Sequence, residues 1–173
     1  MPDLALLPSG AHVFVDTNIF TLHYRSKSVS CNAFVTRIAQ GDLFGYVNLQ
    51  VLSDLLHKLM LAEAVNKGII VRLSAAQLKQ RLQFDRLLAK QLADYQTQFE
   101  DSLRIGFVML PLSRRLLVTT KAERSTYGLL TGDSLHLGCM NRRRPVLTHI
   151  ATQDGDFQHI PGITMWTPMD VIP

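Results

Sequence analysis

The sequence predicts an α/β protein with one domain, built as a three-layer α/β/α sandwich around a mostly parallel central sheet. Short β-branched and aromatic runs alternate with longer segments whose apolar residues recur at helical spacing. Strands separated by helices of this length pair in parallel through right-handed crossovers. The 173 residues, of which 47% are hydrophobic, suffice for one buried core and are few for two ordinary domains. We therefore expect residues 1–173 to form a single domain.

The N-terminal third contains two predicted strands, each followed by a helix. Residues 12–15 form a short apolar run that stops at Asp16 and Thr17, which are both favoured at helix starts. A second strand over residues 45–48 leads into a helix, for which Gly68 is a natural end signal. The apolar positions of that helix recur at helical spacing: Leu49, Leu52, Leu55, Leu56, Leu59 and Met60.

The middle of the chain predicts an extended helical segment. Ser74 with Gln77 three residues later resembles a capping box, and an apolar stripe continues as far as Leu103. This pattern predicts one long helix or a helix pair. We expect the whole stretch from about residue 63 to 104 to be a helical insertion or an extended helix pair.

The C-terminal third returns to strands and helices. Residues 105–110 form a buried-type strand, followed by a helix from Ser113 to near Gly128 and another from Asp133 to Met140. Two further strands are then predicted, and Pro168 favours an edge position for the last of them. These strands are residues 145–150 and 163–166.

Four aspartates follow or interrupt these elements. In open parallel sheets, ligands bind outside the carboxyl ends of the strands, where Asp16 and Asp154 each follow a strand. Asp133 begins a helix and Asp54 lies within one. Clustered carboxylates repel each other unless a cation relieves the repulsion, and Mg²⁺ and Mn²⁺ prefer such oxygen ligands. The four acids therefore predict a metal-dependent hydrolase.

Each acid also has a structural explanation that needs no metal. Asp16 and Asp133 could serve as helix caps, Asp54 could pair with Lys58 four residues later, and Asp154 could belong to an ordinary turn. The joint interpretation rests on placement, because one topology brings two strand ends and a helix start together.

Polar and basic groups near the acids have two interpretations each. Thr17, Asn18 and Thr152 could orient a carboxylate or contact a phosphate, and could equally serve in capping and turns. His136 could support the site or pack in the core, and we leave it outside the catalytic set. The arginines at 142–144 could steer an RNA backbone or form a solvated helix end.

Composition and missing motifs exclude several other classes. The formal charge of +4 fits an anionic partner without identifying nucleic acid. The two cysteines match neither a zinc spacing nor a disulfide framework. The sequence lacks Walker A, GxGxxG, GxSxG and HExxH motifs. The N-terminal stretch does not read as a secretory signal and no apolar segment is long enough to span a membrane, so we expect a soluble, cytoplasmic protein.

Three motifs resemble those of the PIN domain family, and within it the VapC-like toxins of toxin–antitoxin pairs. They are VFVDTNIF at residues 13–20, YGLLTGDSLHLGCM at 127–140 and IATQDGDF at 150–157. The resemblance spans nearly the whole chain. It implies that metal is bound by Asp16, Asp133 and Asp154, with the neighbouring groups assisting; these are Asp156, Thr17, Asn18 and Thr152.

The chain departs from the family pattern in two places. The helix after the second strand offers Asp54 where the family usually has Glu, and residues 63–104 are longer than in the compact toxins. This longer stretch could form a clamp, a partner site or a homodimer surface, and its apolar stripes allow a dimer without requiring one.

The resemblance implies a metal-dependent endoribonuclease that cuts single-stranded or looped RNA with Mg²⁺ or Mn²⁺ and has a small antitoxin partner. In that mechanism a metal-activated water attacks the phosphodiester, and Asp54 or Asp156 completes a second cation position. Two alternatives remain open. One is a catalytically degenerate PIN-fold RNA-binding or scaffolding module, and the other is a structure-specific DNA nuclease.

Overall fold

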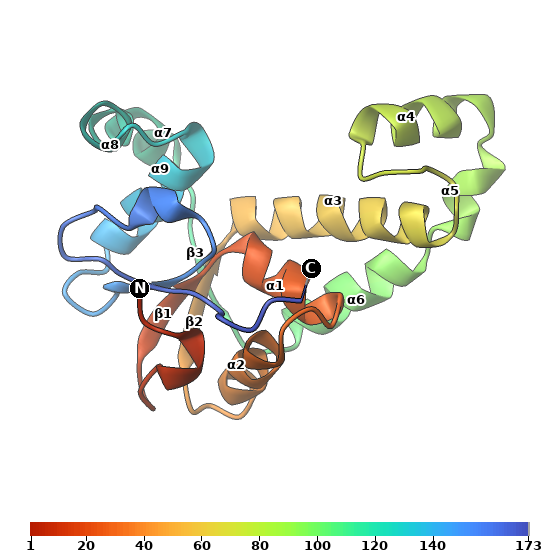
Figure 1. Cartoon of the computed structure of the whole chain (residues 1–173). Helices are drawn as coiled ribbons and strands as arrows, with labels where there is room; N and C mark the ends of the chain where they lie inside the picture. Colours follow the sequence, from red (N-terminus) through yellow and green to blue (C-terminus); the bar gives the residue numbers. More distant parts are fainter. Residues whose placement is uncertain (173) are drawn as a thin grey trace. The chain divides into compact units, whose positions relative to one another are not determined.

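The computed structural model describes residues 1–172, and the chain divides into two compact units. The first comprises Met1–Leu52 and the chain from Ile105 onward, and the second is Ser53–Arg104. Figure 1 traces both along the sequence from red to blue. Among residues 1–172, no helix combines the length and apolar character needed to cross a membrane. That the two units act as one domain stays a prediction.

The first unit contains a five-stranded sheet in the order β3-β2-β1-β4-β5, and every neighbouring pair is parallel. This confirms the predicted α/β class and the edge position of the last strand. The strands are β1 (His12–Val15), β2 (Phe44–Asn48), β3 (Val108–Leu110), β4 (His149–Ala151) and β5 (Thr164–Trp166). The helices of this unit are η1 (Leu4–Leu6), α1 (Thr17–Tyr24), α2 (Val29–Ala39), α7 (Arg114–Thr119), α8 (Lys121–Tyr127), α9 (Thr131–Asn141) and η2 (Gly155–Phe157).

Helices pack on both faces of this sheet. On one face, the ring of Phe14 in β1 lies 5.1 Å, centroid to centroid, from that of His136 in α9. On the other, a Cβ added to Gly45 of β2 would lie 2.9 Å from Cδ1 of Ile38 in α2. Successive residues of a strand point to opposite faces, and Gly45 pairs with Val13, the neighbour of Phe14. The three-layer α/β/α architecture is therefore confirmed.

Two strands begin at least three residues later than predicted, because turns occupy their first predicted positions. Strand β3 begins at Val108, since Gly106 adopts a left-handed φ of 92° that no strand residue takes. Strand β4 begins only at His149. The amides of Val146 and Leu147 instead donate to the Arg143 carbonyl, at 3.0 and 3.2 Å, in the turn that follows α9.

The helix predicted from Ser113 to Gly128 is divided at Thr120. Ser113 caps α7 and Gly128, with φ 70°, ends α8 as expected. At Thr120, however, ψ is 4° and the hydroxyl donates to the Leu116 carbonyl at 3.0 Å. A Cβ on Gly138 of α9 would lie 2.5 Å from the Thr120 methyl, so this glycine allows α9 to approach the break closely.

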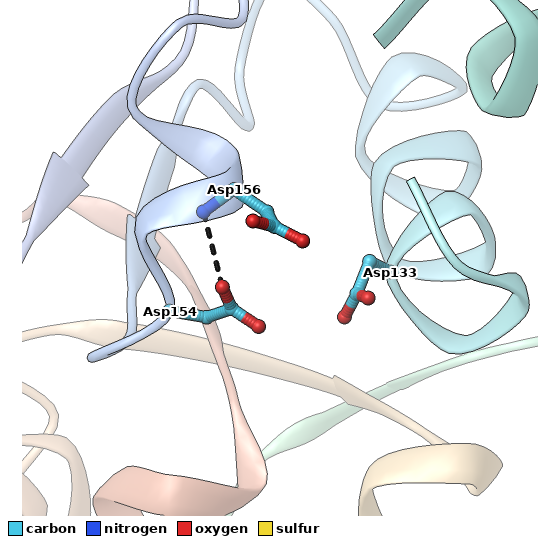
Figure 2. Close-up of side chains that lie close together, drawn as sticks. All are labelled: Asp133, Asp154 and Asp156. Carbon is cyan, nitrogen blue, oxygen red and sulfur yellow. Dashed lines mark hydrogen bonds between the residues drawn. The ribbon is translucent and has the colours of Figure 1, made fainter. Parts of the chain in front are cut away.

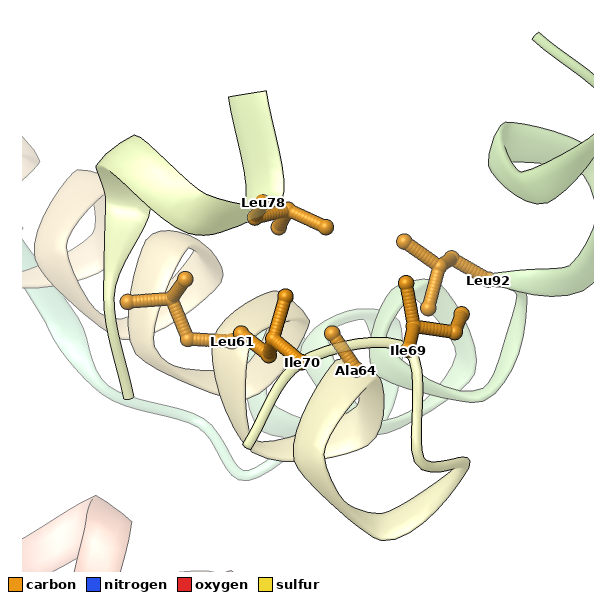
Figure 3. Close-up of a cluster of buried hydrophobic side chains, with 6 residues drawn as sticks. All are labelled: Leu61, Ala64, Ile69, Ile70, Leu78 and Leu92. Carbon is orange, nitrogen blue, oxygen red and sulfur yellow. The ribbon is translucent and has the colours of Figure 1, made fainter. Parts of the chain in front are cut away.

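Residues 75–103 of the second unit form three helices, where one long helix or a helix pair was predicted. The chain breaks at Asp85 (φ −136°, ψ 99°) and at Leu92 (φ −90°, ψ 97°), both of which are extended. Leu92 points into an apolar cluster between the helices (Figure 3). The helices are α4 (Ala75–Phe84), α5 (Leu87–Gln91) and α6 (Asp94–Leu103); α3 (Leu49–Asn66) passes from the first unit into the second. The cluster consists of Leu61, Ala64, Ile69, Ile70, Leu78 and Leu92.

A buried acid explains where α6 begins. The carboxylate of Glu63, only 6% exposed, accepts hydrogen bonds from the amides of Ala93, Asp94 and Tyr95 and from the Lys67 ammonium. Burial opposes ionisation, but the Lys67 contact and the three amides outweigh it and hold the pKa of Glu63 below its ordinary value. Amides at a helix start lack partners within the helix, so Glu63 supplies what a local cap would.

Candidate metal centre

A buried threonine joins the carboxyl ends of β1 and β4. The strands are neighbours, and the Asp16 amide donates to the Ala151 carbonyl at 3.1 Å just beyond β1. The hydroxyl of Thr152, which is fully buried, donates to Oδ2 of Asp16 at 2.6 Å and accepts from Nδ2 of Asn18 at 3.0 Å. Residues far apart in sequence are thus fixed at one edge of the sheet.

The Asp16 carboxylate is held in one orientation. Oδ1 accepts from the Thr17 amide at 2.5 Å, which caps α1, and Oδ2 accepts from Nδ2 of Asn18 at 2.6 Å as well as from Thr152. A carboxylate offers about four acceptor positions. These three bonds leave roughly one for another ligand.

The turn after β4 holds two more acids. The Asp154 amide donates to the Thr152 hydroxyl oxygen at 3.0 Å, which anchors the turn to the Asp16 network. Oδ1 of Asp154 then accepts from the Asp156 amide at 3.0 Å and so caps the 3-10 helix η2 (Figure 2). The turn interpretation of Asp154 is therefore correct, and the turn brings a second carboxylate to the same place.

Asp133 faces this turn from another element. It lies in the first turn of α9, where Leu130 rather than Asp133 occupies the cap position. Oxygen atoms of Asp133, Asp154 and Asp156 all lie within 4.8 Å of one another, and Figure 2 shows the three side chains converging. The structure therefore brings together acids separated by about twenty residues of sequence.

Without a cation, the carboxylates of this group repel one another. Partial burial, followed by the charges of Asp154, Asp16 and Asp156, raises the pKa of Asp133 from 3.8 to about 6. Like charges that cannot all ionise freely have this effect, and a bound cation reverses it.

The donor set fits a hard divalent cation. All three candidate ligands are carboxylates, which Mg²⁺ and Mn²⁺ prefer. Ligands on opposite sides of an octahedral Mg²⁺ lie about 4.2 Å apart. Adjacent ligands lie about 3 Å apart, so carboxylate oxygens within 4.8 Å of one another can share one ion once the side chains move closer.

The structure places the predicted site residues in two groups. Asp133 and Asp154 lie together, with Asp156, which sequence reasoning ranked as supporting, as their third member. Asp16 is outside this trio, although its charge acts on Asp133. Asp54 is half-buried on α3 in the second unit, so its participation stays a prediction.

The assisting groups also divide by what they contact. Asn18 and Thr152 bind Asp16 directly, and Oδ1 of Asn18 additionally accepts from the Gln153 amide at 3.2 Å. The Thr17 hydroxyl turns away and donates to the Val51 carbonyl at 3.3 Å. Thr17 therefore contributes through its amide.

Sequence reasoning overlooked Asn48, at the carboxyl end of β2. Its fully buried amide donates to Nδ1 of His136 at 3.0 Å, and its Oδ1 accepts from the Val51 amide at 3.1 Å, where α3 begins. Asn48 thereby links β2, α3 and α9. The sequence signal for Asn48 was its position at the end of a strand, because ligands bind outside the carboxyl ends of parallel strands. The same rule had identified Asp16. His136 itself is 4% exposed, which matches the packed alternative.

The fold and this acid group define a parallel α/β protein with a hard-ligand site at the carboxyl edge of its sheet. No protein-family model and no curated protein matches the chain. Among solved structures, the chain is similar to one from VapBC2 of Rickettsia felis, determined bound to a DNA fragment from their promoter. The TM-score is 0.53 at 14% identity, over 90% of this chain and 98% of that one. This likeness supports the fold.

Proposed function

We propose that the protein is a metal-dependent endoribonuclease of the PIN type, acting as the VapC-like toxin of a toxin–antitoxin pair in the cytoplasm. The observation that carries the proposal is the convergence of Asp133, Asp154 and Asp156, with the raised pKa of Asp133. The motif resemblance and the likeness to a VapBC2 chain support the same class.

The acids have distinct roles in this proposal. Asp133, Asp154 and Asp156 would hold Mg²⁺ or Mn²⁺, and Asp16 would bind it through its remaining acceptor position or through a water. When bound, the cation would lower the pKa of a water and offset the charge that develops on the phosphate. Thr152 and Asn18 hold the Asp16 carboxylate in one orientation through hydrogen bonds of 2.6 Å.

An antitoxin is the proposed protein partner, and the helical unit offers a surface for it. Val71 is 91% exposed and Phe84 83% exposed. Both line a cavity of about 390 Å³ whose other walls include Ile69, Ile70 and Arg81. Large apolar side chains at this exposure, grouped around a hollow, are typical of protein interaction sites. A second copy of the chain is the alternative occupant, and sedimentation of the purified protein distinguishes the two.

The experiment that tests the activity is cleavage of a mixed set of single-stranded and hairpin RNAs, with matched DNAs and a branched DNA. Wild-type protein and Asp154→Asn, purified identically, are incubated with Mn²⁺ or with EDTA. RNA cutting that requires Mn²⁺ and disappears in Asp154→Asn supports the proposal. Cutting that persists in the variant comes from another source and counts against it.

The two rivals predict different results in the same experiment. A degenerate PIN-fold module binds RNA in EDTA and cuts nothing with Mn²⁺, and Asp54 in place of the usual Glu is the observation that favours it. A structure-specific DNA nuclease cuts the branched DNA in preference to every RNA.

A further inference from the structure

A second cavity lies at the end of β3, apart from the acid group. Its volume is about 170 Å³, and its walls are Leu110, Pro111, Cys139, Arg142 and Arg143. Leu110 is the last residue of β3, and Cys139 lies in the last turn of α9. All of these residues belong to the sheet-containing unit.

The arginines of this cavity are not committed to acids. Arg142 and Arg143 are exposed, and neither forms an ion pair with any carboxylate among residues 1–172. The side-chain contact of Arg142 is a long one, 3.4 Å from Nη1 to the Ser113 hydroxyl. By contrast, Nε of Arg37 lies 2.6 Å from Asp42. The cavity therefore presents two guanidinium groups whose donors are available to an anion.

The other residues that line the cavity are apolar. Leu110 and Cys139 are each 2% exposed, and Pro111 completes the surface beside them. Burial raises the pKa of the Cys139 thiol, so this group is neutral and behaves as a small hydrophobe. Apolar residues beside two arginines suit a ligand that combines phosphate with a sugar or base, since guanidinium planes bind phosphate oxygens in pairs and stack on bases.

The cavity and the acid group share one edge of the sheet and one helix. Leu110 pairs in register with Asn48, so β3 ends at the same carboxyl edge as β1 and β4. Asp133 is in the first turn of α9 and Arg142 is its C-cap residue. The residues between 133 and 142 correspond to about 13 Å of helix, a separation that a strand of a few nucleotides can cover.

We propose that the Arg142–Arg143 cavity is an RNA-backbone site that binds a phosphodiester of single-stranded RNA away from the acid group, with the attached nucleoside against Leu110 and Pro111. This assignment deepens the proposed function and rests on RNA being the substrate. The site supplies affinity and directs the strand along the carboxyl edge, and it takes no part in bond breaking.

The test is RNA binding in EDTA, where cleavage does not interfere. A labelled single-stranded RNA of about ten nucleotides, a length that such surfaces cover, is titrated with full-length protein by fluorescence anisotropy. We compare wild type with Arg142→Gln/Arg143→Gln. The matched control, Arg25→Gln/Arg144→Gln, removes the same charge. Arg144 donates to the Pro161 carbonyl and is absent from the cavity wall, and Arg25 caps the far end of α1 from Asp16.

The cavity variant is expected to bind RNA about tenfold more weakly, with the salt dependence of log K reduced by about 0.7 for each lost phosphate contact. The control is expected to change affinity by less than about twofold, since it disturbs only the diffuse field. Equal losses in both variants, or no RNA binding by wild type, overturn the proposal. Tighter binding of DNA of the same sequence overturns the assignment to RNA.

Cleavage by the same proteins separates this proposal from the proposed function. Arginine-dependent RNA binding without Mn²⁺-dependent cutting removes the nuclease and leaves the RNA-backbone site. Mn²⁺-dependent cutting with an unchanged KM in Arg142→Gln/Arg143→Gln removes the RNA-backbone site and leaves the nuclease.

Discussion

Replacing Asp133 with Asn should stabilise the metal-free protein at neutral pH. The pKa of this carboxyl is raised from 3.8 to about 6. A shift of about two pKa units, converted in full, corresponds to about 3 kcal/mol in the free energy of unfolding. Because Asp133 is only partly buried, solvent screening reduces the expected gain to about 1 kcal/mol. Asn keeps the shape of the side chain and removes the charge that its acidic neighbours oppose.

The pH dependence of this effect has a definite sign. Between pH 3.8 and about 6 the folded protein retains the Asp133 proton more strongly than the unfolded chain does. Wild-type stability therefore falls as pH rises through this window. The advantage of Asp133→Asn is present above pH 6 and disappears below pH 3.8.

Urea unfolding in EDTA, followed by Trp166 fluorescence at neutral and acidic pH, measures this prediction. Trp166 is the single tryptophan of the chain and lies on β5, in the same unit as Asp133. Glu100→Gln, at an exposed position of α6, serves as the control and should change stability by less than about 0.5 kcal/mol. An Asp133→Asn protein that is no more stable than wild type at pH 7.5 would refute the electrostatic argument.

Substitutions at three further sites test one packing contact and two carboxylate hydrogen-bond networks. Gly138→Ala places a Cβ 2.5 Å from the Thr120 methyl and should lower the free energy of unfolding, measured in urea, by about 1–3 kcal/mol. Adding Thr120→Ser removes that methyl and should recover much of the loss. No recovery would contradict the contact. Glu63→Ala leaves the start of α6 uncapped and Lys67 without its buried partner. It should therefore lower the free energy of unfolding by roughly 3 kcal/mol and accelerate amide hydrogen exchange in α6. Unaltered exchange would argue against the role of Glu63 at the start of α6. Asp170 is exposed but accepts hydrogen bonds from Ser28 and Ser30, and these bonds outweigh desolvation and lower its pKa to about 2. Asp170→Asn should therefore lower the free energy of unfolding by about 1 kcal/mol after solvent screening above pH 3.8, and this loss should fade as the pH drops toward 2. A loss that does not depend on pH would refute the assignment.

Local sequence patterns were sufficient to predict the parallel sheet because its strands are short apolar runs, and the helices between them begin and end at residues with strong capping preferences. Asp16 and Ser113 cap the helices expected of them, and Gly128 ends α8 in the left-handed conformation. At these places, local preference and tertiary structure agree. The carboxyl-edge rule then sufficed to bring Asp16 and Asp154 to one edge of the sheet, because it depends on topology alone.

The division of the helical unit could not be predicted because its causes are tertiary. The apolar stripe runs on through Leu92, yet this residue is extended and points into the cluster around Ile69. The next helix begins on the carboxylate of Glu63, thirty residues earlier than Ala93 in the chain. Nothing in the local sequence marks Glu63 as a cap. Helical periodicity identifies which side of a segment is buried, and not where the segment turns.

The composition of the acid group was also beyond sequence reasoning. Asp156 follows Asp154 by two residues and resembles one side of an ordinary turn, but the 3-10 helix turns its carboxylate toward Asp133. Asp16 looked equivalent to Asp154, yet three hydrogen bonds use most of its acceptor positions. Which carboxylate oxygens remain available depends on these contacts, and they join residues far apart in the chain.

Calorimetric titration of EDTA-stripped protein with Mn²⁺ tests most directly whether the acid group holds the proposed catalytic cation. Wild type is expected to bind Mn²⁺ saturably, with affinity at least about tenfold weaker in Asp133→Asn and unchanged in Glu100→Gln, because each carboxylate supplies both a ligand and charge. Wild-type protein that binds no Mn²⁺, or an Asp133→Asn variant that binds it equally well, would show that the acid group does not hold the cation.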